Sequence, residues 1–160
     1  MAIYATFGKL QGSVTAEGFK DHIECTSFTF SGGRHVSMEV GTGQDREGTK
    51  PYVTEFVLCK TLDKSSPHMW LGSLVGKAID KVEIKCIKTA EDDLEQYLSY
   101  TLEEVLVSNY DISSDNGTDG FEAVNLAYNK IEMKYHPRMN DNTLGSAIPA
   151  GYDVKTGKKL

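Results

Sequence analysis

Alternating apolar and polar positions predict β-strands along most of the chain. The strictest alternation lies in residues 81–86, where charged and apolar side chains take turns: Lys81, Val82, Glu83, Ile84, Lys85 and Cys86. A period of two places the charged side chains on one face of a strand and the apolar ones on the other. Similar strand patterns cover residues 3–10, 22–30, 34–40, 52–60, 94–107 and 121–135. The chain is therefore predicted to be mainly β.

One segment has a helical period instead. Ser65 or Ser66 can cap a helix through a side-chain oxygen, and Pro67 suits the first helical turn. Apolar residues then recur at helical spacing before Gly76 ends the run: Met69, Trp70, Leu71, Leu74 and Val75. This predicts one short helix, from about Pro67 to Lys77, whose apolar side chains fill the interior of the β domain.

The last long strand contains a change of parity. Its apolar residues fall on one face up to Tyr128 and on the other face from Ile131. A bulge near Asn129 and Lys130, or a strand covered on both faces, accounts for the change.

Residues 31–50 form a long extended loop that is rich in glycine and in charges of both signs. Two interpretations are open for this segment, from about Ser31 to Lys50. It is either a solvated loop or an arm that docks onto another copy of the chain through paired charges. The docking interpretation uses Arg34, His35, Glu39, Asp45, Arg46 and Glu47.

Composition narrows the function classes. The 160 residues are expected to form a single domain, 1–160, with a sizeable core. The net charge of −6 argues against nucleic acid as a partner, because phosphate binding needs clustered Lys and Arg.

We expect no membrane insertion and no signal peptide, since no apolar stretch is long enough and the N-terminus reads as a strand. Three cysteines, Cys25, Cys59 and Cys86, fit reduced thiols in a cytosolic chain.

Two segments imitate known ligand-binding loops. Residues 111–122, from Asp111 to Glu122, place oxygen-bearing side chains at calcium-loop spacing, but Asn116 replaces the required glycine and both flanks read as strands. Residues 43–50 imitate a phosphate loop with the lysine in the wrong place. A hairpin and a flexible loop are favoured over metal or phosphate sites.

Nothing in the sequence favours an enzyme. The cysteines lie within predicted strands, and the four histidines are scattered with no pair at zinc-site spacing. We therefore expect no catalytic residues, no metal site and no cofactor.

Four segments, in order, resemble the Hcp (haemolysin-coregulated protein) family, the tube subunit of the bacterial type VI secretion system. They are residues 23–30 (IECTSFTF), residues 46–55 at the entry to the next strand, the strand-to-helix junction from Lys60 to Trp70, and residues 151–156 (GYDVKT). At the junction the resemblance rests on Lys60, Asp63, Ser66, Pro67, Met69 and Trp70. The set spans almost the whole chain.

The resemblance implies a two-sheet β-barrel with one short helix, closing into a homo-hexameric ring whose lumen holds effector proteins. It also implies rings stacked into a tube, joined in part by the loop from Ser31 to Lys50. The implied partners are a spike protein, a contractile sheath and a baseplate. The tube is expected to assemble in the bacterial cytoplasm and to be secreted by the machine.

A lateral contact between subunits is suggested by Lys81, Glu83 and Lys85, whose alternating charges suit a mixed-sign interface, although a solvated face has the same pattern. Two other functions compete with the tube subunit. A monomeric barrel that binds a small ligand predicts an apolar interior pocket. A metal-dependent enzyme requires the loop from Asp111 to Glu122 plus a nucleophile and base that the sequence does not offer.

Overall fold

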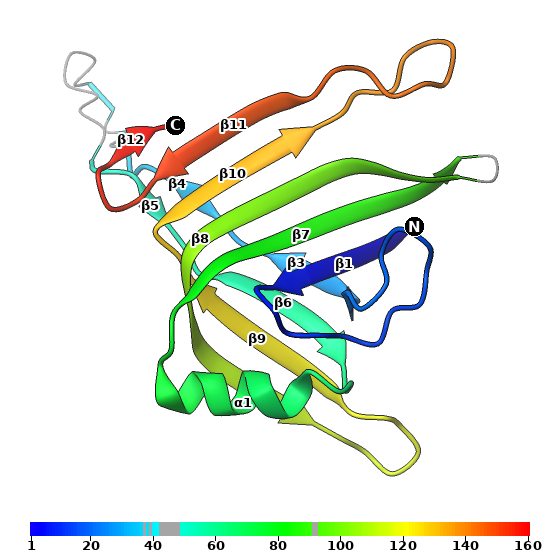
Figure 1. Ribbon diagram of the computed structural model, residues 1–160. Coiled ribbons are helices and arrows are strands. Elements are labelled where there is room, and N and C mark those ends of the chain that lie inside the picture. The colour runs from blue at the N-terminus through cyan, green and yellow to red at the C-terminus, as the bar shows by residue number, and fades with distance from the viewer. Residues whose placement is uncertain (37, 39, 42–48, 91–92) are drawn as a thin grey trace.

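The computed structural model describes residues 1–36, 38, 40–41, 49–90 and 93–160. This part of the chain forms twelve strands and one helix (Figure 1). In chain order they are β1 (Ala2–Phe7), β2 (Ile23–Cys25), β3 (Ser27–Thr29), β4 (Gly32–Gly33), β5 (Tyr52–Val53), β6 (Phe56–Thr61), α1 (Ser66–Val75), β7 (Ile79–Ala90), β8 (Asp93–Ser113), β9 (Phe121–Ala127), β10 (Lys130–Tyr135), β11 (Ile148–Asp153) and β12 (Lys158–Lys159). The mainly β prediction is confirmed.

Strand β8 organises the fold because it belongs to both halves of a bent sheet. Its first half pairs with β7 and β10, in the order β12-β11-β10-β8-β7-β1-β2. Its second half pairs with β9, which continues to β6 and β3. Strands β4 and β5 form a separate two-stranded sheet. Figure 1 shows the two halves diverging from β8, with α1 beside the lower one.

The bend in β8 lies at Glu104, which has a φ of 52°. This left-handed conformation is unusual for a residue with a side chain. The neighbouring strand breaks at the same level, since β9 ends at Ala127 and β10 begins at Lys130. There Asn129 donates its backbone N–H to Glu103 O (3.1 Å) and its side-chain amide to the Glu104 carboxylate. The single strand predicted over residues 121–135 is therefore wrong: it is two strands, and the break between the two halves accounts for the change of parity in place of the expected bulge.

The halves share one hydrophobic core. Its fully buried members come from strands on both sides and include Phe56, Leu58, Val82, Ile84, Leu102 and Leu126. Phe28 and Phe30 stack on Phe56, with ring centroids 5.3 and 5.0 Å apart. These side chains occupy the space between the sheet halves.

The two-sheet character is confirmed, but the described strands do not form a closed barrel. Strand β2 pairs with β1 and β3 pairs with β6, with no ladder joining those two pairs among the described residues. The chain passes directly from β2 to β3 at Thr26, whose N–H donates to Cys59 O (2.8 Å). The short connection at Thr26 thus joins β2 in one half to β3 in the other.

The predicted short helix is confirmed, and Gly76 ends it as expected. Val75 is the last helical residue, Gly76 takes a left-handed φ of 69°, and its N–H bonds to Gly72 O (3.0 Å). Two details of the prediction are wrong. Ser65 occupies the N-cap but makes no side-chain cap bond, since its hydroxyl donates to the Asp63 carboxylate. The helix also does not fill the interior, because Met69 is the one large apolar side chain of α1 that is buried.

The predicted strand at 34–40 is wrong for the residues described there. Arg34, His35, Val36, Met38 and Val40 lie outside any strand. The segment is tied instead at its base, where β4 pairs with β5 and His35 exchanges hydrogen bonds with Thr49. The paired residues are thus Gly32 and Gly33, which come before the strand that the side-chain alternation predicted.

All three thiols are free, as predicted, with Cys25 and Cys86 buried and Cys59 half-buried. Burial raises the pKa of Cys25 to about 12. In the part of the chain that the structure describes, no helix is long and apolar enough to cross a membrane.

Candidate functional site

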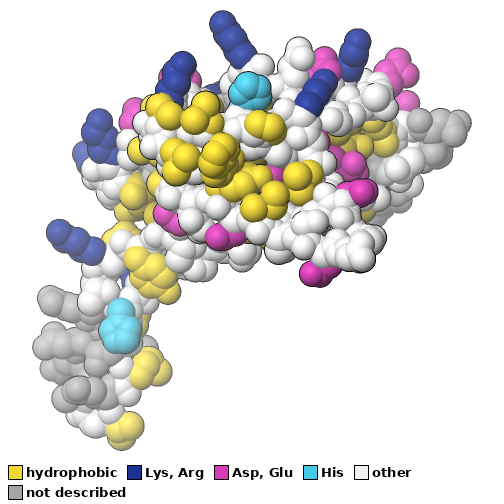
Figure 2. Space-filling view, turned by 90° about the horizontal axis from the view of Figure 1, so that it is seen from below, with side chains coloured by type: hydrophobic (Ala, Val, Ile, Leu, Met, Phe, Trp, Pro, Cys, Tyr) yellow, Lys and Arg dark blue, Asp and Glu magenta, His cyan; other side chains and the backbone are white. Residues whose placement is uncertain are grey.

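An exposed apolar surface covers the outer side of α1. Four large side chains on this helix are more than half exposed: Trp70 (54%), Leu71 (52%), Leu74 (68%) and Val75 (66%). We call these four residues the α1 face. Figure 2 shows apolar side chains gathered on the side of the molecule seen from below, with Lys and Arg side chains along one border. An apolar helix surface of this kind is typical of a contact with another protein.

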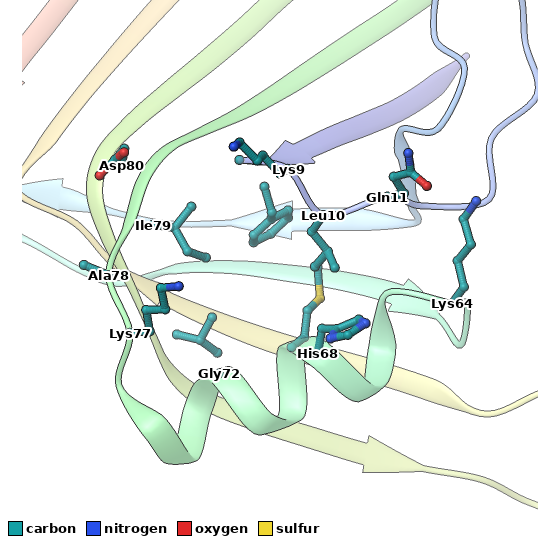
Figure 3. Close-up of a pocket in the computed structure, with 14 residues that line it drawn as sticks. Lys9, Leu10, Gln11, Lys64, His68, Gly72, Lys77, Ala78, Ile79 and Asp80 are labelled. Atoms are coloured by element: carbon teal, nitrogen blue, oxygen red, sulfur yellow. The ribbon is translucent and has the colours of Figure 1, made fainter.

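A groove runs along the side of α1, between the helix and the chain that follows β1 (Figure 3). Its volume is about 920 Å³. The apolar lining comes from Phe7, Leu10, Met69, Ile79 and Val107, and the polar lining includes Lys9, Gln11, Lys64, His68, Lys77 and Asp80. The groove is therefore apolar at its floor and mainly basic at its rim.

A buried ion pair fixes the start of α1 to the sheet. The register of β6 and β9 places Lys60 directly opposite Glu122. The two side chains are 1% and 0% exposed, and the ammonium group binds the carboxylate. Such a pair is tolerated in a core only when further hydrogen bonds satisfy both groups.

The further hydrogen bonds come from the helix start and from β8. Ser66 at the first position of α1 donates to Glu122 Oε2 (2.9 Å) and accepts from Lys60 Nζ (3.1 Å). Lys60 also donates to Thr61 O (2.9 Å), and its Nζ lies 3.1 Å from Asp63 Oδ1. Tyr110 on β8 donates to the other Glu122 oxygen, and burial together with this carboxylate raises the pKa of the Tyr110 phenol. We call this set (Lys60, Asp63, Ser66, Tyr110 and Glu122) the anchor network.

The anchor network changes the interpretation of the predicted calcium-like loop. The loop requires Glu122 as its last ligand, but this carboxylate is fully buried and bound to Lys60, Ser66 and Tyr110. Residues 111–113 belong to β8 and Phe121 begins β9, so the segment is a hairpin connection. Within the described residues, no group of three or more His, Cys, Asp or Glu could hold a metal ion.

The charged residues predicted on β7 lie where the alternation puts them. Lys81 is exposed, Glu83 and Lys85 are half-buried, and the intervening Val82 and Ile84 are buried. Glu83 binds both neighbours, with Lys81 Nζ at 2.6 Å and Lys85 Nζ at 3.7 Å. The Lys81 hydrogen bond holds the pKa of Glu83 below its usual value.

The same sheet face carries further ion pairs. Lys130 on β10 lies 3.3 Å from Glu103 on β8, and Lys134 lies 3.2 Å from Glu132. The three predicted residues are thus part of a wider strip of paired charges that crosses β7, β8 and β10. Surface pairs of this kind contribute little to stability, and they leave a face of mixed sign for contacts with other molecules.

The predicted arm is described only in part. Arg34 and His35 are exposed and lie just beyond β4, close to the hydrogen-bonded pair of His35 and Thr49. Glu39, Asp45, Arg46 and Glu47 lie outside the described residues, as does most of the imitation phosphate loop at 43–50. Arg34 and His35 follow β4 of the two-stranded sheet, whereas the charges of β7 belong to the ten-stranded sheet.

The α1 face and the anchor network were not predicted from the sequence. The sequence did contain a sign of the α1 face, since the apolar residues of α1 occupy too many sides of the helix to pack into one core. The anchor network left no sign in the local sequence, because Lys60 and Glu122 are 62 positions apart. Only the pairing of β6 with β9 brings them together.

Comparisons with known proteins identify the fold and the family. A family model described as "Type VI secretion system effector, Hcp" matches residues 4–135. Protein hcp1 of Pseudomonas aeruginosa is 27% identical over 108 residues, covering 66% of this chain and 67% of that protein. A solved "type six secretion system protein" superposes with a TM-score of 0.92 at 25% identity, covering 99% of both chains. Hcp1 from Salmonella typhimurium shares the fold, with a TM-score of 0.80 at 24% identity over 99% of this chain and 98% of that one. The chain belongs to the Hcp family of type VI secretion proteins.

Proposed function

We propose that this type VI secretion protein is a structural tube subunit that forms hexameric rings, which stack into a tube and carry effector proteins in the lumen. The observation that carries the proposal is the family match over residues 4–135, together with the likeness of almost the full chain to a type six secretion system protein. The role is mechanical and needs no catalytic residue. The whole chain, 1–160, acts as one domain in this proposal.

Unpaired sheet edges support self-assembly. Strand β11 pairs with β12 only at Tyr152 and Asp153, so the stretch from Ile148 to Ala150 leaves one edge unpaired among the described strands. Exposed edges invite pairing with another chain, and closure into a ring covers them. In this proposal the charges of Lys81, Glu83 and Lys85 contribute to the lateral contact between subunits.

Ring stacking is assigned to the arm, with Arg34, His35, Glu39, Asp45, Arg46 and Glu47 as its contact residues. Their mixed charges suit a second copy of the same surface or of a neighbouring edge. The base of the arm supports this role, because β4 and β5 pair only with each other and form a separate two-stranded sheet.

The proposed partners follow from the same role. They are a spike protein at the tip of the tube, a contractile sheath around it, a baseplate, and effector proteins in the lumen. The tube assembles in the bacterial cytoplasm and leaves through the machine.

Light scattering coupled to size-exclusion chromatography tests the ring. We expect a mass of about 106 kDa, six subunits of 17.7 kDa each, with ring-shaped particles in negative-stain electron microscopy. A strictly monomeric protein at high concentration contradicts the proposal and favours the monomeric ligand-binding alternative. That alternative is weakened by the core, because buried side chains fill the space between the sheet halves.

A charge reversal tests the arm. Arg46→Glu combined with Glu47→Arg keeps the net charge and should leave single rings intact while impairing tube growth. A matched reversal, Glu17→Lys with Lys20→Glu, changes two exposed residues of another loop and should grow tubes normally. Normal stacking of the Arg46 and Glu47 variant, seen by electron microscopy, refutes the assignment of the arm.

A further inference from the structure

The α1 face has no cover within the described part of its own chain. Trp70 and Leu74 are one turn apart, as are Leu71 and Val75, so the four side chains form one continuous outward patch. Each of the four side chains keeps more than half of its surface in contact with water, so the stabilisation that burial would give is only partly realised at these positions. A continuous apolar patch that stays exposed to solvent indicates a binding surface.

The surface is preformed. Ser66, at the start of α1, is buried and bonded to both Lys60 and Glu122, and Met69 packs into the core one turn later. At the other end Gly76 terminates the helix with a left-handed turn. Because both ends are fixed, little ordering of the helix is needed when a partner binds.

The groove beside the helix adds a charge preference. Three lysines line it from three different segments: Lys9 after β1, Lys64 before α1 and Lys77 before β7. Lys64 is partly neutralised by Asp21, 3.5 Å away, whereas Lys9 and Lys77 form no ion pair with any described residue. Figure 3 shows the lysines around a floor that contains Leu10 and Ile79. The rim is thus basic in a chain whose net charge is −6.

We propose that the α1 face and the adjoining groove dock an amphipathic segment of another protein, whose apolar side chains are flanked by acidic residues. Apolar side chains fill the patch and the groove floor, while carboxylates meet the lysines of the rim. The proposal concerns the surface of one subunit and does not depend on the proposed ring.

A second copy of this chain is a poorer occupant. The helix Ser66–Val75 contains no acidic residue, so it cannot supply the carboxylates. If two α1 faces met through a two-fold axis, Lys64 and Lys77 of both copies would approach each other. Like charges brought together in this way disfavour the pairing.

Trp70 makes the proposal directly testable, because it is the only tryptophan in the chain and lies in the patch. The probes are two synthetic helical peptides of about 18 residues with the same leucine stripe, one flanked by Glu and one by Lys. Each is titrated into the full-length protein while the Trp70 emission is recorded. We expect the Glu peptide to shift the emission to the blue and to bind at least about tenfold more tightly than the Lys peptide, with a preference that falls as salt rises.

Three variants assign the binding site. Leu74→Glu places a charge in the exposed patch and should abolish the shift, whereas Met139→Glu, at an apolar residue that is also more than half exposed but lies in a loop outside α1, should bind like the parent protein. Combining Lys9→Glu with Lys77→Glu should reverse the preference in favour of the Lys peptide. Circular dichroism confirms that each variant is folded.

Three outcomes overturn the proposal. Equal binding of both peptides shows that the basic rim selects nothing. The absence of a Trp70 shift with either peptide shows that the patch is not a docking surface. A blue shift that grows with protein concentration alone, and that Leu74→Glu removes, assigns the patch to a second copy instead. Ring formation is tested separately, by light scattering.

Discussion

Replacing Lys60 with methionine is expected to be among the most damaging single changes in this protein. Lys60→Met keeps the length of the side chain but removes the one cation of the anchor network. The fully buried Glu122 carboxylate then loses its counter-ion, and Asp63 loses the ammonium group 3.1 Å away. Removing one partner of a buried ion pair costs about 3–5 kcal/mol. A domain is stable by only about 5–15 kcal/mol, so this loss is large.

The opposite change should cost less. Glu122→Gln removes the carboxylate, but Lys60 retains Asp63 as a counter-ion and Thr61 O as an acceptor. The amide of glutamine can still accept from Ser66 and contact Tyr110. We expect a loss of about 1–2 kcal/mol, the size of a weakened hydrogen bond to a charged group.

The two changes together provide the sharpest test. Glu122→Gln should destabilise the parent protein but stabilise the Lys60→Met variant, because there it removes an unpaired buried charge. Urea unfolding at one fixed protein concentration, followed through Trp70 fluorescence and circular dichroism, measures the four free energies of unfolding. If Glu122→Gln destabilises both backgrounds equally, the charges are not coupled and the reasoning fails.

Three other expectations concern single positions. Gly76→Ala should lower the free energy of unfolding, measured in urea, by about 1–2 kcal/mol, because Gly76 has a left-handed φ. Gly72→Ala inside α1 should stabilise the protein, because an added methyl group meets no atom within 4 Å there. Because the folded state lowers the pKa of Glu83, this residue stabilises the fold at pH values above its usual pKa of 4.5, and the stabilisation is lost as the pH falls through the lowered pKa. Lys81→Met should therefore flatten the acid side of a plot of Tm against pH. Since burial raises the pKa of Cys25 to about 12, a thiol reagent at pH 8 should label it, by mass spectrometry, only after unfolding. A plot unchanged by Lys81→Met, or labelling of Cys25 in the folded protein, contradicts these expectations.

The strands that the sequence predicted best are those with one buried and one exposed face. Residues 81–86 alternate strictly, and β7 follows this alternation. The end of β8 was missed because residues 108–113 are mostly polar and exposed, so they read as a loop. Their strand conformation depends on pairing with β9, which is a contact distant in sequence.

The candidate surfaces were harder to predict for a related reason. Helical spacing identified α1 but could not show whether its apolar side chains face the core or solvent. The alternation on β7 placed its charges correctly, yet the partners on β8 and β10 depend on the sheet register. Lys60 and Glu122 became a pair only through the register of β6 with β9. What the sequence lacked in each case was the identity of the spatial neighbour.

The course of β8 has a consequence for how the molecule responds to mechanical load. Its 21 residues span roughly 70 Å when extended, and the same backbone serves both halves of the sheet. A pull along this strand loads its hydrogen bonds to β7, β10 and β9 in shear, so many bonds must break at once. Tension applied at the β7–β8 hairpin therefore reaches the half that carries α1 through covalent bonds, without relying on side-chain packing.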